Sequence, residues 1–238
     1  MNTLNTIKRE LAGAANAEKA KSMKKYFQAK PGGYGEGDTF MGITVPKQRE
    51  ISKKHYKQIS LAEIMEMLKQ PIHEYRLTAI FMLVLKFQKA KDAQVKNEIE
   101  QLYLKHLNYV NNWDLVDSSA HHILGPQLMH KDKELLYTLA NDNNLWKQRV
   151  AIIATLHFIR EQHFDDTLRI AEMLLNHKHD LIHKAVGWML REVGNKNFDV
   201  EYQFLSKHYK RMPRTMLRYA IEKFPEDLRQ KFLKGLVE

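Results

Sequence analysis

Alanines at the centres of apolar segments recur along this chain at a nearly constant spacing. Ala79, Ala151, Ala185 and Ala220 each lie in the middle of such a segment, and successive members are 72, 34 and 35 residues apart. The segment around Trp113 fills the gap between the first two, so the period is about 36 residues. Paired antiparallel helices at this period bury their apolar faces only by stacking on the next pair. We therefore predict an all-α fold, a HEAT- or TPR-like α-solenoid with a concave surface.

Glycine and proline, which interrupt helices, are scarce. The chain has 10 Gly and 6 Pro, and half of the glycines lie between residues 32 and 42. The segment 31–42 is predicted to be a flexible loop, because no strand precedes it and it lacks the Lys and Ser/Thr of a phosphate-binding loop. Nothing in the sequence reads as a strand. We expect a single domain over residues 1–238, with this loop between the N-terminal helices and the repeats. Helices are predicted over residues 3–12, 16–29, 61–70, 73–89, 92–107, 113–125, 131–140, 144–161, 164–176, 181–194, 198–210, 213–224 and 226–236, with one more beginning near Pro46.

The composition narrows the class of protein. The chain is 44% hydrophobic and 28% charged, as in globular proteins, and its apolar runs are shorter than the ~20 residues that cross a bilayer. The N-terminal segment has no apolar stretch of the signal-peptide type. The lack of cysteine excludes disulfides, iron–sulfur clusters and thiol nucleophiles. A net charge of +10 favours a polyanionic partner, most often nucleic acid. We expect an intracellular, cytoplasmic protein that is associated with DNA and not with a membrane.

The segment NNWDLVDSSAHHILG, residues 111–125, contains the most informative polar residue. Asn111 or Asn112 is a good helix N-cap, and Asp114 would lie in the first turn, where the helix dipole favours a negative charge. Trp113 and Asp117 are four residues apart and share one helix face. Asp117 lies among apolar residues, where an aspartate has poor helix propensity and loses hydration, so it needs another explanation. An aromatic plane beside a carboxylate suits a cation.

The repeat period relates this helix to later ones. One period after Trp113 is Arg149, and a second period ends one helical turn before Trp188. Equivalent helices of a solenoid line one surface, so these residues and Asp117 are expected on a common face, and Arg76, near one period before Trp113, belongs to the same series.

Such a surface combines groups of different chemistry. Arginine binds phosphates, and indoles offer flat faces to sugars, bases or positive charge. A carboxylate repels phosphate, so its presence requires a positive charge that forms nearby. Cleavage of an N-glycosidic bond supplies one, because the sugar becomes oxocarbenium-like as the base departs. Hydrolysis of this bond requires neither a metal nor a cofactor, and we expect none.

Four separated segments also carry a family resemblance. GEGDTFMGITVP, NWDLVDSSAHHILG, WKQRVAI and DLIHKAVGWMLREVG resemble, in order and spacing, the signature segments of the AlkD-like DNA glycosylases, the DNA alkylation repair family. The resemblance extends from about residue 17 to about residue 224. It implies a HEAT-like repeat protein that wraps double-stranded DNA and excises positively charged N3- or N7-alkylated purines, such as 3-methyladenine and 7-methylguanine. The implied enzyme is a monofunctional hydrolase of base excision repair that does not insert the base in a pocket. We expect a monomer.

The resemblance also implies roles for individual residues. Asp117 corresponds to the catalytic carboxylate of the family, Trp113 and Trp188 to its cleft tryptophans, and Arg149 to its cleft arginine, which fixes a phosphate. In the implied mechanism Asp117 opposes the positive charge that develops on the sugar, while the tryptophans hold the sugar and exclude water.

A second set of residues is implied to bind DNA. Tyr26 matches a third aromatic wall, although Phe27 is an alternative because family members vary in length near this position. Arg214 and Arg218 resemble basic residues of the last repeat that contact the DNA backbone. Arg76, which was placed by the repeat period, completes the predicted DNA-binding set.

Simpler interpretations stand beside these. The tryptophans are also explained as core residues, and Asp117 as a helix cap or the partner of a buried Arg149. For the whole chain, the alternatives are a non-catalytic paralogue that binds DNA structures and a helical-repeat scaffold for an acidic protein. His177, His179 and His183 are interpreted as surface histidines, because no carboxylate completes a metal-binding pattern.

Overall fold

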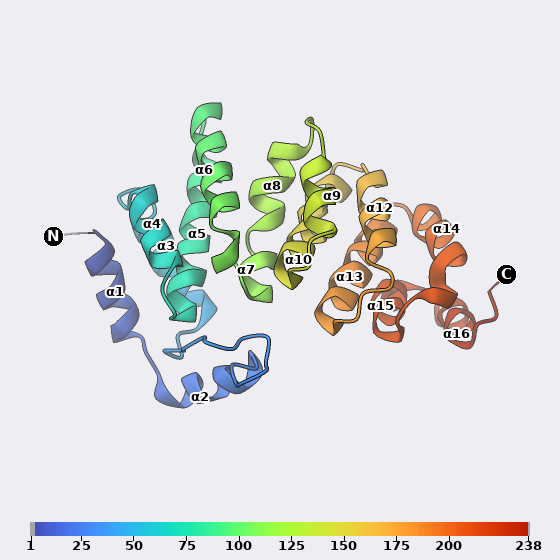
Figure 1. Ribbon diagram of the computed structural model, residues 1–238, viewed down its shortest axis with the longest axis horizontal. Coiled ribbons are helices and arrows are strands. Elements are labelled where there is room, and N and C mark those ends of the chain that lie inside the picture. The colour runs from blue at the N-terminus through green and yellow to red at the C-terminus, as the bar shows by residue number, and fades with distance from the viewer. Residues whose placement is uncertain (1–2, 238) are drawn as a thin grey trace. The chain divides into compact units, whose positions relative to one another are not determined.

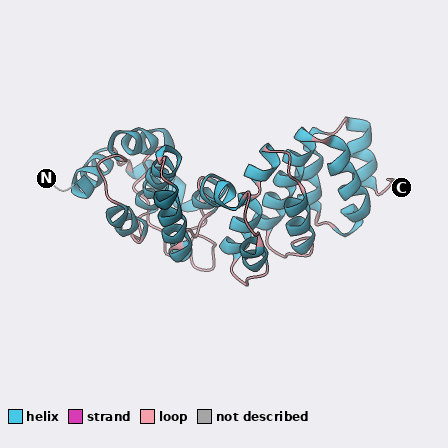
Figure 2. Cartoon of the chain, turned by 90° about the horizontal axis from the view of Figure 1, so that it is seen from above, coloured by secondary structure: helices cyan, strands magenta, loops and turns pink. Residues whose placement is uncertain are grey.

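The computed structural model describes residues 3–237, which form helices joined by loops (Figure 1). This part of the chain contains no β-strand; one isolated bridge joins Thr39 to Ile72 (Figure 2). The prediction of an all-α fold is therefore confirmed. Among the described residues, no helix is both long and apolar enough to cross a lipid bilayer. The chain divides into two compact units, Met1–Ser119 and Ala120–Glu238. The single-domain organisation stays a prediction.

The first unit is built around one long apolar helix. Its helices are α1 Thr3–Gly13, α2 Ala17–Tyr26, α3 Val45–His55, α4 Leu61–Leu68, α5 His73–Lys89, α6 Ala93–Lys105, the short 3-10 helix η1 Leu107–Tyr109, and α7 Trp113–Asp117. Helix α5 contacts α3, α4, α6 and α7, and α1 packs on α3 and α4. Most residues of α5 are buried, as expected of a helix that is apolar on most of its circumference.

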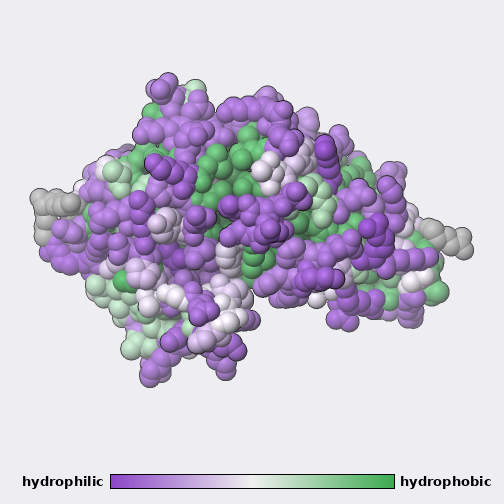
Figure 3. Space-filling model, viewed as in Figure 1, coloured by the Kyte–Doolittle hydropathy of each residue, from purple (hydrophilic) through white to green (hydrophobic). Residues whose placement is uncertain are grey.

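Helix α2 differs from the others in this unit. None of its residues is buried, so it lies on the outside of the packed helices. Asn16 caps its N-terminus and accepts a hydrogen bond from the Lys19 amide. Hydrophilic residues cover most of the face shown in Figure 3, whereas α2 and the loop after it form a paler, mixed area.

The second unit has two layers of helices. It contains α8 Ala120–Leu128, α9 Glu134–Ala140, α10 Leu145–Ala154, α11 Leu156–Arg160, α12 Asp165–Met173, α13 Asp180–Lys196, α14 Phe198–His208, η2 Tyr209–Arg211, α15 Arg214–Ala220, η3 Ile221–Lys223 and α16 Glu226–Lys234. Helices α8, α10, α13 and α15 pack one against the next in one layer. Helices α9, α12 and α14 lie beside them in the other layer (Figure 1).

The periodic alanines lie in four packed helices, although Ala220 is the last residue of α15 and not at its centre. Ala79 of α5, Ala151 of α10, Ala185 of α13 and Ala220 of α15 are all fully buried. In the second unit, the spacings of 34 and 35 residues are the steps from α10 to α13 and from α13 to α15. Where α13 meets α15, a Cβ on Gly187 would lie 2.4 Å from the carbonyl oxygen of Met216, so only glycine allows this approach.

Two predicted helices are broken in the structure. The helix predicted over 113–125 ends at Asp117 and restarts as α8, and the helix predicted over 144–161 divides into α10 and α11. A side-chain hydroxyl lies at each break: Ser119 donates to the Leu115 carbonyl at 2.6 Å, and Thr155 donates to the Ile152 carbonyl at 2.7 Å. Such bonds compete with the backbone hydrogen bonds that would continue the helix.

Candidate functional site

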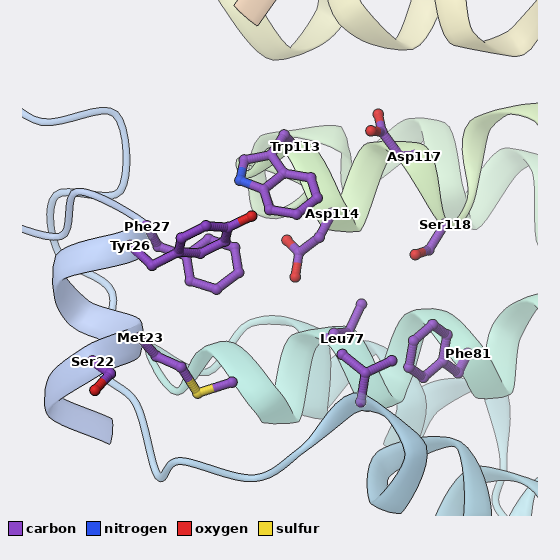
Figure 4. A pocket seen from close by; sticks show the side chains of 11 residues that line it. Ser22, Met23, Tyr26, Phe27, Leu77, Phe81, Trp113, Asp114, Asp117 and Ser118 are labelled. Carbon is purple, nitrogen blue, oxygen red and sulfur yellow. The ribbon is translucent and has the colours of Figure 1, made fainter. Parts of the chain in front are cut away.

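A pocket of about 690 Å³ lies in the first unit, between α2, the start of α3, α5 and α7 (Figure 4). Tyr26, Trp113 and Asp117, which were predicted to belong to one site, all line it. Its apolar floor includes Leu77 and Phe81 of α5. The full lining consists of Ser22, Met23, Tyr26, Phe27, Val45, Leu77, Phe81, Trp113, Asp114, Asp117 and Ser118.

Aromatic rings form one wall of this pocket. The Phe27 and Trp113 rings are stacked, with centroids 5.4 Å apart and planes 16° apart. Tyr26 meets Trp113 edge-on at 6.0 Å and is 66% exposed, whereas Phe27 is buried. Both candidates for the third aromatic position therefore line the pocket, with Tyr26 at its solvent side.

Two carboxylates also line the pocket. Asp117 is half-buried, and its carboxylate points away from Leu77 and Phe81 (Figure 4). Asp114 lies closer to the interior, with a side chain that is 12% exposed. The lining contains no lysine or arginine. In a chain with a net charge of +10, the lining of this pocket thus combines aromatic and apolar residues with two aspartates and no lysine or arginine.

Helix α7, which carries three of the lining residues, has only five residues and is fixed at both ends. At its start, the Asn112 side chain accepts a hydrogen bond from the Trp113 amide at 2.9 Å, as predicted for the asparagine pair. After its end, the buried Ser119 hydroxyl lies 2.9 Å from the Tyr103 hydroxyl. Trp113 and Asp117 therefore lie on a helix that tertiary contacts hold in place.

A buried group of charged residues lies behind the aromatic wall, and we call Asp38, His73, Arg76 and Asp114 the His73 cluster. His73 donates from Nδ1 to Asp38 at 3.0 Å and from Nε2 to Asp114 at 2.8 Å. Arg76 pairs with Asp38 at 2.5 Å, and the Asn112 amide donates to Asp38 at 3.2 Å. The cluster therefore connects the loop 31–42, which we call the Gly-rich segment, with the start of α5 and with α7.

Opposing effects set the protonation states in this cluster. Burial alone would lower the pKa of His73, but its hydrogen bonds to Asp114 and Asp38 outweigh burial and raise the pKa to about 9. Burial alone would raise the pKa of Asp38, but the His73 hydrogen bond and the charge of Arg76 lower it below its usual value. Near neutral pH, His73 is an imidazolium and Asp38 a carboxylate.

The end of the Gly-rich segment is held by a second buried carboxylate. Glu74 accepts hydrogen bonds from the amides of Met41 at 3.0 Å, Gly42 at 2.7 Å and Ile43 at 3.2 Å. Gly42 has φ of +80°, and a Cβ there would lie 2.0 Å from the Asn16 carbonyl oxygen. The segment is a loop, as predicted, and its C-terminal end lies against the start of α2.

Two predicted catalytic residues belong to the second unit. The Arg149 side chain is 5% exposed and donates to the carbonyl of Leu181. Trp188 of α13 is half-buried and donates from Nε1 to Glu192 at 3.0 Å. Their roles at a shared site with Trp113 and Asp117 stay predictions.

The predicted DNA-binding arginines lie in contrasting surroundings. Arg214 and Arg218 are exposed one turn apart on α15, and Arg214 donates to the Leu233 carbonyl at 2.6 Å. Arg76 is 4% exposed, and its observed partners, Asp38 and Asn111, are protein groups. The predicted contact between Arg76 and DNA stays a prediction, but this burial does not favour it.

The sequence interpretation overlooked Asp38, His73 and Glu74, and it explained Asp114 by the helix dipole alone. The structure instead places Asp114 in the pocket lining, in contact with His73. One signal was present: His73 and Glu74 are adjacent polar residues that begin an otherwise apolar helix. Buried polar groups require partners, so this pair predicts polar contacts without identifying them.

Comparisons with solved structures agree with the fold. A predicted DNA alkylation repair enzyme from Enterococcus faecalis is similar with a TM-score of 0.68 and 18% identity, and the match covers 89% of this chain and 97% of that one. AlkD2 from Streptococcus mutans is similar with a TM-score of 0.55 and 16% identity, over 85% of this chain and 98% of that one.

Comparisons at the level of sequence give one further result. No curated protein matches the chain. The family model described as DNA alkylation repair enzyme matches residues 7–224, which is nearly the whole chain. The all-helical fold, the similar solved structures and this match lead to one conclusion: the chain belongs to the DNA alkylation repair enzyme family.

Proposed function

We propose that this protein is a monofunctional DNA glycosylase that hydrolyses the N-glycosidic bond of positively charged N3- or N7-alkylated purines. The observation that carries the proposal is the pocket in which Trp113 and Asp117 of α7 meet Tyr26 of α2. Membership of the family supports a role in DNA alkylation repair. The net charge of +10 supports binding to the DNA backbone.

The proposed chemistry requires electrostatic help rather than a strong acid. An alkylated purine is already cationic, so the bond from C1′ to the base nitrogen breaks as the base takes both bonding electrons and leaves neutral. The sugar becomes oxocarbenium-like, and Asp117 stabilises that charge. Water then adds at C1′ and loses a proton, which leaves an abasic site.

The pocket supports this division of roles. The aromatic wall of Tyr26, Phe27 and Trp113 offers flat surfaces to a cationic sugar and excludes water from it. Asp117 is half-buried, so its charge is screened less than that of a fully exposed carboxylate. Arg149 and Trp188 enter the proposal on the family resemblance. We propose that the enzyme acts on the lesion in duplex DNA and does not insert the modified base into a pocket.

Base release from methylated duplex DNA tests the proposal. Under single-turnover conditions, the protein is expected to release free 3-methyladenine or 7-methylguanine, detected by chromatography. Asp117→Asn is expected to abolish release while it retains DNA binding, because the amide keeps the shape and loses the charge. Asp227→Asn, an exposed carboxylate of α16, is the matched control and should keep the wild-type rate.

Two other functions make different predictions in the same assay. A non-catalytic DNA-binding paralogue would bind DNA in a salt-dependent manner and release no base. A scaffold for an acidic protein would show neither release nor salt-dependent DNA binding. Because Trp113 and Asp117 share one pocket, we favour the enzyme.

A further inference from the structure

The orientation of Trp113 and Asp117 depends on groups outside their own helix. An isolated helix of five residues is not stable, so α7 contributes little to its own placement. Tyr103 and Ser119 hold its C-terminal end. At its N-terminal end, the contacts come from the His73 cluster, through Asp114 and through Asn112.

We propose that His73, as an imidazolium that bridges Asp38 and Asp114, is a positioning residue for the site on α7. This inference rests on the proposed glycosylase function, because it concerns the placement of Trp113 and Asp117. His73 does not line the pocket, so it acts through the groups that it holds.

The geometry around His73 requires a positive charge. Both ring nitrogens lie within hydrogen-bond distance of carboxylate oxygens, which accept only, so both nitrogens must carry protons. Two carboxylates then balance one imidazolium and the Arg76 guanidinium. Glu74, the next residue of α5, directs its carboxylate to the amides at the end of the Gly-rich segment instead. Loss of the proton from His73, which is 1% exposed, would leave one buried carboxylate without its donor.

Two contacts transmit this state to the pocket. The first is the hydrogen bond from His73 to Asp114, the second carboxylate of the pocket lining. This bond holds the Asp114 side chain on His73, so that it does not turn toward Asp117. The second is aromatic: Phe27 lies 4.6 Å from the His73 ring and 5.4 Å from the Trp113 ring. A cation beside an aromatic ring is attracted to it, so the charge on His73 also helps to hold the Phe27 ring, on which Trp113 stacks.

The first test is the pH dependence of base release. For the wild-type protein, we expect the single-turnover rate to fall above about pH 9, as His73 loses its proton. His73→Gln is expected to lower the rate about 10-fold or more, with DNA affinity by fluorescence anisotropy within about 3-fold, and to remove the alkaline limb. Unchanged release and an unchanged alkaline limb in this variant would overturn the proposal.

Two further variants separate positioning from general stability. His106→Gln replaces another buried histidine of the same unit, which bonds the Leu102 carbonyl at 2.8 Å outside the cluster, and it should keep the rate and the pH profile. Asp38→Asn removes one of the two carboxylates that favour the imidazolium, so the alkaline limb should move to lower pH. A limb that stays in place in Asp38→Asn would contradict the assignment to His73.

A spectroscopic measurement keeps this inference separate from the proposed function. In ¹H–¹³C spectra, the ring signals of Trp113 are expected to shift with the same midpoint as those of His73, and the shift should be absent in His73→Gln. This result can be obtained even if the protein releases no base, in which case only the proposed function fails. Trp113 signals that do not follow the His73 titration would refute the positioning role.

Discussion

The free energy of unfolding of Glu201→Gln is expected to increase relative to that of the wild-type protein as the pH rises from about 6 to about 8. Glu201 of α14 is 2% exposed, and its carboxyl occupies the space beside Gly194 of α13, where a Cβ would lie 1.6 Å from Oε2. Its Oε1 has no hydrogen-bond partner among the described residues. Burial raises the pKa of Glu201 from 4.5 to about 9, against the opposing charge of Arg191 and with a smaller contribution from Glu192.

The sign and size of the effect follow from proton linkage. Between pH 4.5 and about 9, the folded state keeps the Glu201 proton that the unfolded state has lost. Unfolding therefore releases a proton. Because of this group alone, the free energy of unfolding of the wild-type protein falls by about 1.4 kcal/mol for each unit by which the pH rises. From about pH 6 to about pH 8, the loss amounts to about 3 kcal/mol. The neutral amide of Glu201→Gln has no such dependence.

Urea unfolding of both proteins at these two pH values measures the effect. Contributions from the other titratable groups are common to both proteins, so the change in the stability difference isolates Glu201. We expect the variant to gain about 3 kcal/mol relative to the wild type between the two conditions. Parallel stability curves would show that Glu201 is ionised in the folded protein near neutral pH, and the argument from burial would be refuted.

Further predictions concern the Gly-rich segment and α2. Gly42→Ala should lower the free energy of unfolding by more than the ~1–2 kcal/mol of a left-handed conformation, because its Cβ would also meet the Asn16 carbonyl. Gly13→Ala, with no atom within 4 Å of its Cβ, is the control and should be neutral or slightly stabilising in thermal unfolding. Lys24→Glu combined with Lys25→Glu, on the exposed helix α2, should weaken DNA binding and reduce the slope of log affinity against log salt by about 0.9 for each lost phosphate contact. An unchanged slope would exclude these lysines from the DNA contact.

The fold could be predicted because its main determinant is periodic. Apolar segments that carry an alanine at intervals of 34 and 35 residues are a local signal, and these alanines are buried in successive packed helices of the second unit. The breaks after Asp117 and near Thr155 could not be predicted in this way. Serine and threonine occur inside many helices, and only the tertiary partner Tyr103 distinguishes Ser119, which lies in the break between α7 and α8.

The candidate site could also be predicted only in part. Trp113 and Asp117 are paired by helix geometry alone, and the sequence indicated both. The His73 cluster joins residues 35 and 41 positions apart, from His73 to Asp38 and to Asp114, and no periodic pattern specifies such contacts. The sign of the net charge predicts a polyanionic partner, whereas the local concentration of carboxylates in the pocket depends on the fold.

The clamp formed by Glu74 holds the second half of the chain between α2 and α3, and the end of α2 holds the first half. Three consecutive amides, from Met41 to Ile43, are fastened to one side chain of α5. Residues 33–35 pack against the end of α2: the Tyr34 hydroxyl donates to the Tyr26 carbonyl at 3.2 Å, and a Cβ on Gly35 would lie 2.3 Å from the Phe27 carbonyl oxygen. Insertions or deletions within 33–35 should therefore displace Tyr26 and Phe27 and disturb the aromatic wall of the pocket.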